Sequence, residues 1–267
     1  MGRGRLTQSH TGSMKKAFLI VILLLLIFSQ SHEPVFQQVV LEKSAYVFLL
    51  HGLARSSRSM GELENSLLSH GYRVIKVDYP STEHPIEYLA DEILSDVIEQ
   101  YSKAVQTKIH FVTHSMGGIV VRYYLKHHDL PNLGRIVMLS PPNQGSELVD
   151  RLRGNFIFKK CYGPAGQQLG TAEGSILVSL GPVDFELGVI TGTRSFNPIS
   201  SVMIPGPDDG VVSVARAKVS GMTDFLTIPQ SHAFIVHNQE VIDQAIHFLE
   251  NGEFRHKAPE KGGQSIH

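Results

Sequence analysis

Residues 109–125 read IHFVTHSMGGIVVRYYL, and this stretch decides the expected fold. Ile109–Thr113 is an apolar run of strand length, and Ile119–Leu125 has the composition of a buried helix. Ser115 lies in the short turn between them, followed closely by two glycines. A serine on a tight strand-to-helix turn is held with its Oγ exposed above the edge of a sheet. The stretch therefore predicts a layered α/β fold and makes Ser115 a candidate nucleophile.

This turn departs at one position from the usual pattern G-x-S-x-G. Thr113 stands where the first glycine is expected, whereas Gly117 and Gly118 keep the second half intact. Small residues are needed here because the turn is strained and backbone segments crowd together. The alternative interpretation is a glycine-rich turn in which Ser115 only caps a helix. The strand before the turn and the helix after it favour the nucleophile.

Outside this stretch the chain alternates short apolar runs with amphipathic segments. The runs are nearly continuous in apolar residues, which is typical of parallel strands covered on both faces. The predicted strands are Ala45–Leu50, Arg73–Asp78, Ile109–Thr113, Ile136–Ser140, Leu187–Gly192 and Phe225–Ile228. Such alternation predicts a mostly parallel, doubly wound sheet with helices on both faces.

Helix signals fall between these runs. Ser59 and Glu62 have the spacing of a capping box, and Pro85 precedes a long apolar stripe that ends near Tyr101. A closing helix is expected over 241–249. We therefore predict a catalytic domain over residues 44–250, with a small glycine-rich insertion over 151–184.

The two ends of the chain have different compositions from this domain. Four basic residues precede an unbroken apolar run over 17–28, the pattern of a secretory signal. As a helix this run spans about 18 Å, short of a bilayer core of about 30 Å. We predict that residues 1–31 are a signal peptide, giving a periplasmic or secreted protein, or an N-terminal anchor that associates it with a membrane. Residues 251–267 are polar and are predicted to form a flexible tail.

Composition excludes several classes of protein. The 267 residues include 24 Lys+Arg and 25 Asp+Glu, for a formal net charge of -1, which argues against a nucleic-acid partner. The hydrophobic fraction of 42% excludes wholesale disorder. The single cysteine, Cys161, excludes an intramolecular disulfide framework and a thiolate zinc site. The 14 histidines show no metal-ligand spacing, so neither a metal nor a cofactor is expected.

A second loop is expected to support the chemistry of Ser115. The strand predicted over Ala45–Leu50 ends in His51-Gly52-Leu53. A loop of this kind supplies one backbone N–H of an oxyanion hole, and the residue after the nucleophile supplies the other. We therefore nominate the amides of Leu53 and Met116, and expect the His51 ring to have a structural role.

Two later segments supply an acid and a base. In such sheets the acid follows the serine and the histidine comes last. Asp208 and Asp209 lie in a turn-rich segment before two valines; Asp209 is favoured as the acid, with Asp208 as the alternative. His232 follows the last predicted strand and is the candidate general base, in preference to His237.

With these residues in order, the chain resembles the α/β-hydrolase superfamily, and within it the small bacterial lipase and esterase-like group. The matching motifs are His51-Gly52-Leu53, His114-Ser115-Met116-Gly117-Gly118, Ser140-Pro141-Pro142-Asn143-Gln144-Gly145-Ser146, Asp208-Asp209-Gly210-Val211-Val212 and Ser231-His232. The resemblance implies an α/β-hydrolase fold without a large cap domain. It also implies serine-dependent hydrolysis of carboxylic esters through a Ser-His-Asp triad and an acyl-enzyme, without metal or organic cofactor.

Two other functions remain open. The same triad serves thioesterases, amidases and membrane-lipid acyl hydrolases, and a non-catalytic, membrane-tethered binding protein is a further alternative. An ester or lipid is the expected substrate. Five apolar residues near the proposed mouth suit either an acyl chain or simple core packing: Leu53, Met60, Phe156, Ile157 and Phe158.

Overall fold

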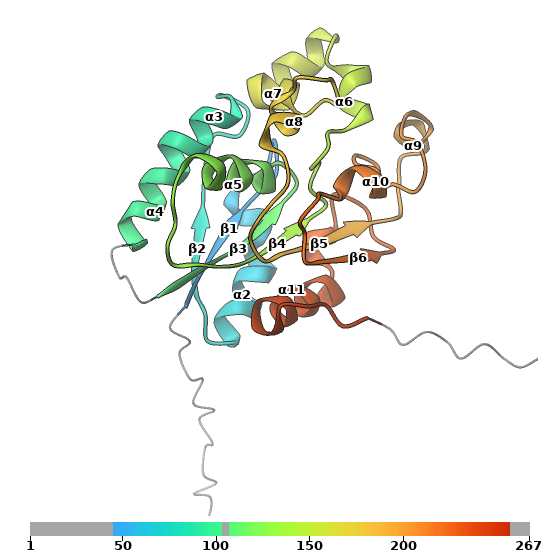
Figure 1. Cartoon of the computed structure of the whole chain (residues 1–267). Coiled ribbons are helices and arrows are strands. Elements are labelled where there is room, and N and C mark those ends of the chain that lie inside the picture. The colour runs from blue at the N-terminus through green and yellow to red at the C-terminus, as the bar shows by residue number, and fades with distance from the viewer. Residues whose placement is uncertain (1–44, 103–106, 257–267) are drawn as a thin grey trace, which may run out of the picture. The chain divides into compact units, whose positions relative to one another are not determined.

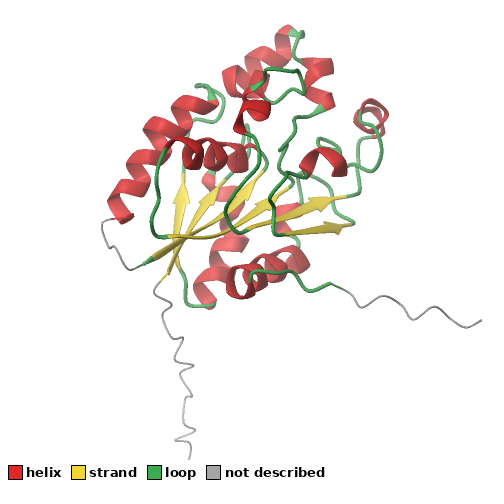
Figure 2. Ribbon diagram, viewed as in Figure 1, coloured by secondary structure: helices red, strands yellow, loops and turns green. Residues whose placement is uncertain are grey.

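The computed structural model describes residues 45–102 and 107–256, which contain one six-stranded sheet. Its strand order is β2-β1-β3-β4-β5-β6, and every neighbouring pair is parallel (Figures 1 and 2). The strands are β1 (Ala45–Leu50), β2 (Arg73–Val77), β3 (Lys108–His114), β4 (Leu133–Leu139), β5 (Leu187–Gly192) and β6 (Asp224–Ile228). The predicted α/β-hydrolase fold is confirmed, and β4 begins three residues before the predicted strand.

Helices cover both faces of this sheet. Val47 and Phe48 are adjacent in β1, yet each is fully buried, in a different hydrophobic cluster. One cluster packs α2 (Gly61–Ser69) and α11 (Gln239–Asn251) against the sheet, and the other packs α5 (Met116–His127). Figure 1 shows α2 and α11 on one side of the strands and α5 on the other. Burial on both faces explains why the strands are apolar without alternation.

Two helix starts differ in detail from the sequence signals. Pro85 does precede a helix, but this helix changes winding along its length, as α3 (Ile86–Tyr88), a π-helical segment η2 (Leu89–Leu94) and α4 (Ser95–Ser102). The predicted capping box is wrong. Ser59 belongs to a preceding 3-10 turn, η1 (Ser57–Met60), and its hydroxyl donates to the Ser56 carbonyl instead.

The predicted insertion folds as short helices near the carboxyl ends of the strands (Figure 1). They are α6 (Glu147–Leu152), α7 (Phe156–Gln168) and α8 (Ile176–Leu180), joined further on by α9 (Pro198–Met203) and α10 (Val214–Ala217). Gly163 interrupts α7 with φ 60°, and a Cβ there would lie 1.7 Å from the Thr82 carbonyl oxygen. Only glycine allows this close approach. No cap domain is evident among the described residues.

The end of the described chain is packed, whereas the sequence suggested a loose tail from residue 251. Phe254 is buried, with its ring centroid 4.9 Å from that of Phe248, and its amide donates to Asp224 Oδ2 at 2.7 Å. Gln244 and Arg255 exchange two hydrogen bonds of 2.8 Å. The buried ring and these hydrogen bonds together hold residues 254–255 against the domain.

The predicted leader or anchor over 1–31 and the rest of the tail, 257–267, lie outside the described residues. Within the described ranges, no helix combines the length and the apolar character that crossing a bilayer requires.

Candidate active site

Ser115 occupies a strained turn between β3 and α5. Its backbone has φ 52° and ψ -123°, a region of backbone angles that residues other than glycine rarely adopt. Its amide donates to the Leu139 carbonyl at 2.8 Å. The turn fits tightly against β1, because a Cβ on Gly117 would lie 2.7 Å from the Leu50 carbonyl oxygen. Neighbouring strands therefore hold the serine in place.

The threonine that departs from the usual pattern is accommodated by the next glycine. Thr113 is fully buried, and a Cβ on Gly118 would lie 3.1 Å from its Oγ1. The side chain of Thr113 thus fills space that the absent side chain of Gly118 leaves free. This explains how a β-branched residue fits at the first glycine position.

The structure brings together the three residues nominated as nucleophile, base and acid. Ser115 Oγ lies 3.0 Å from His232 Nε2, and His232 Nδ1 lies 2.8 Å from Asp209 Oδ2. With Nδ1 protonated and donating to the carboxylate, Nε2 is free to accept the serine proton. These side chains come from residues 115, 209 and 232, and an unbroken path of hydrogen bonds joins them.

Asp209 is fixed and ionised by its surroundings. It is 1% exposed, and its Oδ1 accepts from the amides of Val211 and Val212 at 3.0 and 2.8 Å. Burial by itself would raise the pKa of Asp209, but the charge and hydrogen bond of His232 and the Val212 amide hold that pKa below its usual range. The carboxylate therefore faces His232 as an anion at neutral pH.

Asp208, the alternative acid, has a different task. Its Oδ1 accepts from the Gly210 amide at 2.7 Å and from the Ser201 hydroxyl at 2.9 Å. It is buried and shapes the turn that presents Asp209. Neither of its contacts involves His232.

His114 is a residue near the site that the sequence did not single out. Its Nε2 donates to the backbone carbonyl of His232 at 3.0 Å, and the two rings lie 5.0 Å apart. Burial, reinforced by the nearby His232, lowers the pKa of His114 to about 3, so the ring stays neutral. Its position directly before Ser115 was the one sequence signal for a role at the site, although nothing in the sequence showed which way the ring points.

The two nominated oxyanion donors lie close to the nucleophile. The Met116 amide is the first of α5, where a helix leaves its N–H groups without internal partners. Among the described residues no acceptor binds the Leu53 amide, whereas the next amide, of Ala54, donates to Ser81 Oγ at 3.0 Å. A Cβ on Gly52 would lie 3.2 Å from Ser115 Cβ, so this loop runs against the serine. Both amides are available to bind a negatively charged oxygen.

His51 packs within this loop as a structural element. Its ring stacks on Tyr79 at a centroid distance of 4.2 Å, and the Tyr79 hydroxyl donates to the His51 carbonyl. Burial lowers the pKa of His51. These contacts fix the strand end from which Gly52 and Leu53 project.

A cavity of about 390 Å³ opens over Ser115. Its walls include apolar side chains from the Leu53 loop and from α6 and α7: Leu53, Leu148, Val149, Leu152, Phe158 and Leu169. Of the five apolar residues expected near the mouth, Leu53 and Phe158 line this cavity. Met60 packs in the core beneath α2, and Phe156 and Ile157 are 76% and 68% exposed without lining it. Within the described ranges, no group of three or more His, Cys, Asp or Glu side chains is placed to hold a metal ion.

Comparisons with known proteins agree with this architecture. Residues 47–229 match the family model described as the Alpha/beta hydrolase family. Similar solved structures include the mature Bacillus licheniformis lipase BlEst2, with TM-score 0.62, 18% identity and coverage of 77% of this chain and 91% of that one. The metagenomic carboxyl esterase MGS0156 has TM-score 0.57 and 17% identity, over 78% of this chain and 71% of that one. At these identities the likeness shows the fold alone. No curated protein sequence matches the chain.

Proposed function

The chain belongs to the Alpha/beta hydrolase family, and from this premise we propose that it hydrolyses carboxylic esters through a covalent acyl-enzyme formed on Ser115. The observation that carries the proposal is the path of two hydrogen bonds, 3.0 Å and 2.8 Å long, from Ser115 through His232 to Asp209. Ser115, where this path begins, lines a largely apolar cavity.

In the proposed acylation step, His232 Nε2 takes the proton of Ser115 while Oγ attacks the ester carbonyl carbon. The resulting imidazolium is stabilised by the Asp209 carboxylate. The same Nε2 then delivers its proton to the leaving alkoxide, and the carbon–oxygen ester bond breaks. Ser115 is left as an acyl ester.

In the proposed deacylation step, water occupies the place of the departed alcohol. His232 removes a proton from this water, whose oxygen attacks the acyl carbon. The imidazolium then returns the proton to Ser115 Oγ as the acyl–Oγ bond breaks, which releases the acid and restores the Ser115 hydroxyl. In both steps the amides of Leu53 and Met116 bind the oxygen that becomes negative. Each such donor contributes about 10²–10³-fold in rate in other hydrolases.

The cavity favours uncharged, apolar acyl groups. The only charged side chain among its lining residues is Arg55, which is exposed. Burying apolar acyl atoms against Leu53, Phe158 and Leu169 contributes to binding at about 25 cal/mol per Å².

Labelling with a fluorophosphonate probe tests the proposal. The wild-type protein is expected to form a covalent adduct, and Ser115→Ala is expected to form none. Ser146→Ala is the matched control, because Ser146 lines the same cavity but its hydroxyl donates to the Val211 carbonyl. Labelling that persists in Ser115→Ala would remove Ser115 from the mechanism. Adduct formation combined with turnover of thioesters or amides far above esters would favour the other acyl bonds.

We further propose export of this hydrolase or its attachment to a membrane. The support is the sequence alone, in the basic residues and the apolar run over 17–28. Cell fractionation followed by mass spectrometry of the N-terminus tests this proposal. A new terminus near residue 31 indicates cleavage, an intact chain in the membrane fraction indicates an anchor, and an intact chain in the cytoplasm contradicts both.

A further inference from the structure

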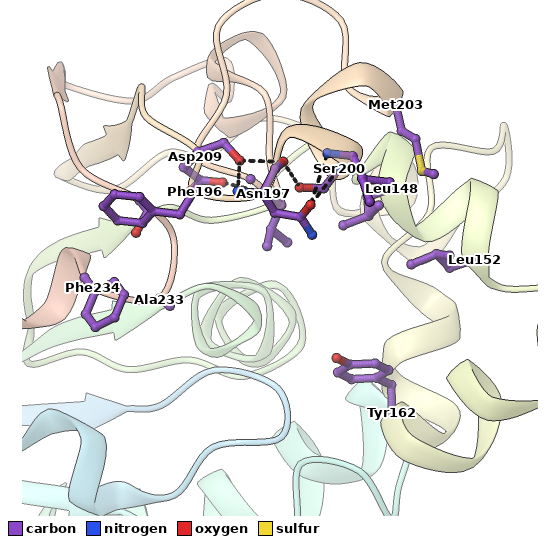
Figure 3. Close-up of a pocket in the computed structure, with 15 residues that line it drawn as sticks. Leu148, Leu152, Tyr162, Phe196, Asn197, Ser200, Met203, Asp209, Ala233 and Phe234 are labelled. Atoms are coloured by element: carbon purple, nitrogen blue, oxygen red, sulfur yellow. Dashed lines mark hydrogen bonds between the residues drawn. The ribbon is translucent and has the colours of Figure 1, made fainter.

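A second apolar groove, of about 500 Å³, adjoins the cavity at Ser115. Its walls come from α6, α9 and the loop that follows His232, as Figure 3 shows. The apolar side chains that line it include Leu148, Leu152, Phe196, Ile199, Met203 and Phe234. The groove lies directly beside the first cavity, because Leu148, Leu152, Tyr162, Val211 and Ala233 line both.

The position of this groove relates it to one side of the reacting ester. Ser231 and Ala233, on either side of His232 in the chain, line it together with Asp209. Leu53, which offers one oxyanion amide, lines only the first cavity. Ser115 and His232 themselves line only the first cavity, so the groove lies beside the His232 loop, on the side away from Leu53. This is the side on which an alcohol must leave, because His232 delivers the proton to it.

The chemistry of the groove favours an apolar, uncharged occupant. Phe196, Ile199 and Phe234 are 68%, 70% and 54% exposed, although they are large and apolar. The rings of Phe196 and Phe234 meet edge to face at 6.1 Å and form one wall. Asp209 is the only acidic or basic lining residue, and it is buried and bonded to His232.

We propose that this groove binds the alcohol portion of the substrate, which selects neutral esters with an extended apolar alcohol. This inference rests on the proposed ester hydrolysis and adds the substrate class to it. The acyl chain then occupies the cavity by Leu53 and Phe158, and the alcohol chain runs between Phe196 and α6. A chain of this kind buries apolar surface at both ends of the scissile bond.

Three esters distinguish binding of the alcohol portion from binding of the acyl portion. Ethyl butanoate is the reference, octyl butanoate has a longer alcohol, and ethyl octanoate has a longer acyl chain. Both butanoates pass through the same acyl-enzyme, so a difference in kcat/KM between them reports on the acylation step. The wild type is expected to hydrolyse octyl butanoate at least about ten-fold more efficiently than ethyl butanoate, because each fully buried methylene contributes a factor of about four. Rates are measured below the solubility limit of each ester.

The variant Phe196→Ser/Ile199→Ser removes two apolar side chains that line the groove at exposed positions, so its folding is not at risk. It is expected to lower the ratio of octyl to ethyl butanoate efficiency by about five-fold or more, mainly through KM. Val202→Ser is the matched control. Val202 lies on α9 with Ile199 and is 89% exposed, but it does not line the groove. It is expected to keep the wild-type ratio.

A wild-type ratio near one, or a ratio unchanged in the double variant, overturns the assignment of the groove. An equal loss in the ratio of ethyl octanoate to ethyl butanoate overturns it too, because the groove would then serve the acyl chain. These outcomes leave ester hydrolysis itself standing. Failure to hydrolyse any of the three esters overturns the proposed function, and the groove assignment with it.

Discussion

Replacing Ser115 by glycine and by alanine measures the strain stored in the turn. Both substitutions delete the hydroxyl, but only glycine adopts φ 52° and ψ -123° without steric cost. A residue in such a region costs about 1–3 kcal/mol. Against this relief, glycine loses about 0.5–1 kcal/mol through the entropy of the unfolded chain, and about 0.8 kcal/mol from the missing methyl group. At the middle of these ranges the terms nearly cancel, so Ser115→Gly is expected to be about as stable as Ser115→Ala.

Ser95 provides the control, because it has helical backbone angles, φ -57° and ψ -51°, where η2 passes into α4. There glycine is expected to be about 1 kcal/mol less stable than alanine. Thermal or urea unfolding of the four variants measures the two differences, which are expected to diverge by about 1–2 kcal/mol. In melting temperature this is about 2–8 °C for a domain of this size. The same glycine penalty at both positions would show that Ser115 carries no strain, and would refute the reasoning.

Three further predictions concern the acid, the neutral histidine and the packed glycine. Asp209→Asn is expected to lower kcat for a short ester by about 10⁴-fold, the size of the corresponding loss in serine proteases, whereas Asp208→Asn loses far less; the reverse order would exchange their roles. Burial lowers the pKa of His114 to about 3 in the folded protein, against 6.5 in the unfolded chain. The neutral ring therefore contributes fully to folding stability above pH 6.5, and this contribution is lost as the pH falls toward 3. The free energy of unfolding between about pH 7.5 and 5 should depend less on pH in His114→Gln, and an equal dependence would contradict this. Gly117→Ala places a Cβ 2.7 Å from a backbone oxygen and is expected to cost about 1–3 kcal/mol in denaturant unfolding, whereas Gly61→Ala, with open space around it, should be neutral or stabilising.

The sequence was sufficient for the inner strands because they are largely buried on both faces. Apolar runs such as Ile109–Thr113 and Leu187–Gly192 have no polar face to interrupt them, and their boundaries agree with the structure to within a few residues. The meeting of Ser115, Asp209 and His232 also follows from topology, since the carboxyl ends of parallel strands share one edge of a sheet.

Other features depend on contacts that are distant in the sequence. The ring of His114 turns toward the carbonyl of His232, 118 residues further on, and no local pattern encodes that direction. The helices over 147–180 are short and one is broken at Gly163, so their periodicity is too weak to read. Phe254 was assigned to a tail because its neighbours are polar, although its own burial decides the outcome.

The acid and the base are joined to each other twice. Besides the side-chain contact, the His232 amide donates to the Asp209 carbonyl at 2.9 Å. The pair is thus a preassembled module, whose internal alignment is set by its own two contacts. Insertions between Gly192 and Asp208, where α9 now lies, could therefore diversify during evolution and recode specificity while the proton-handling pair stays intact.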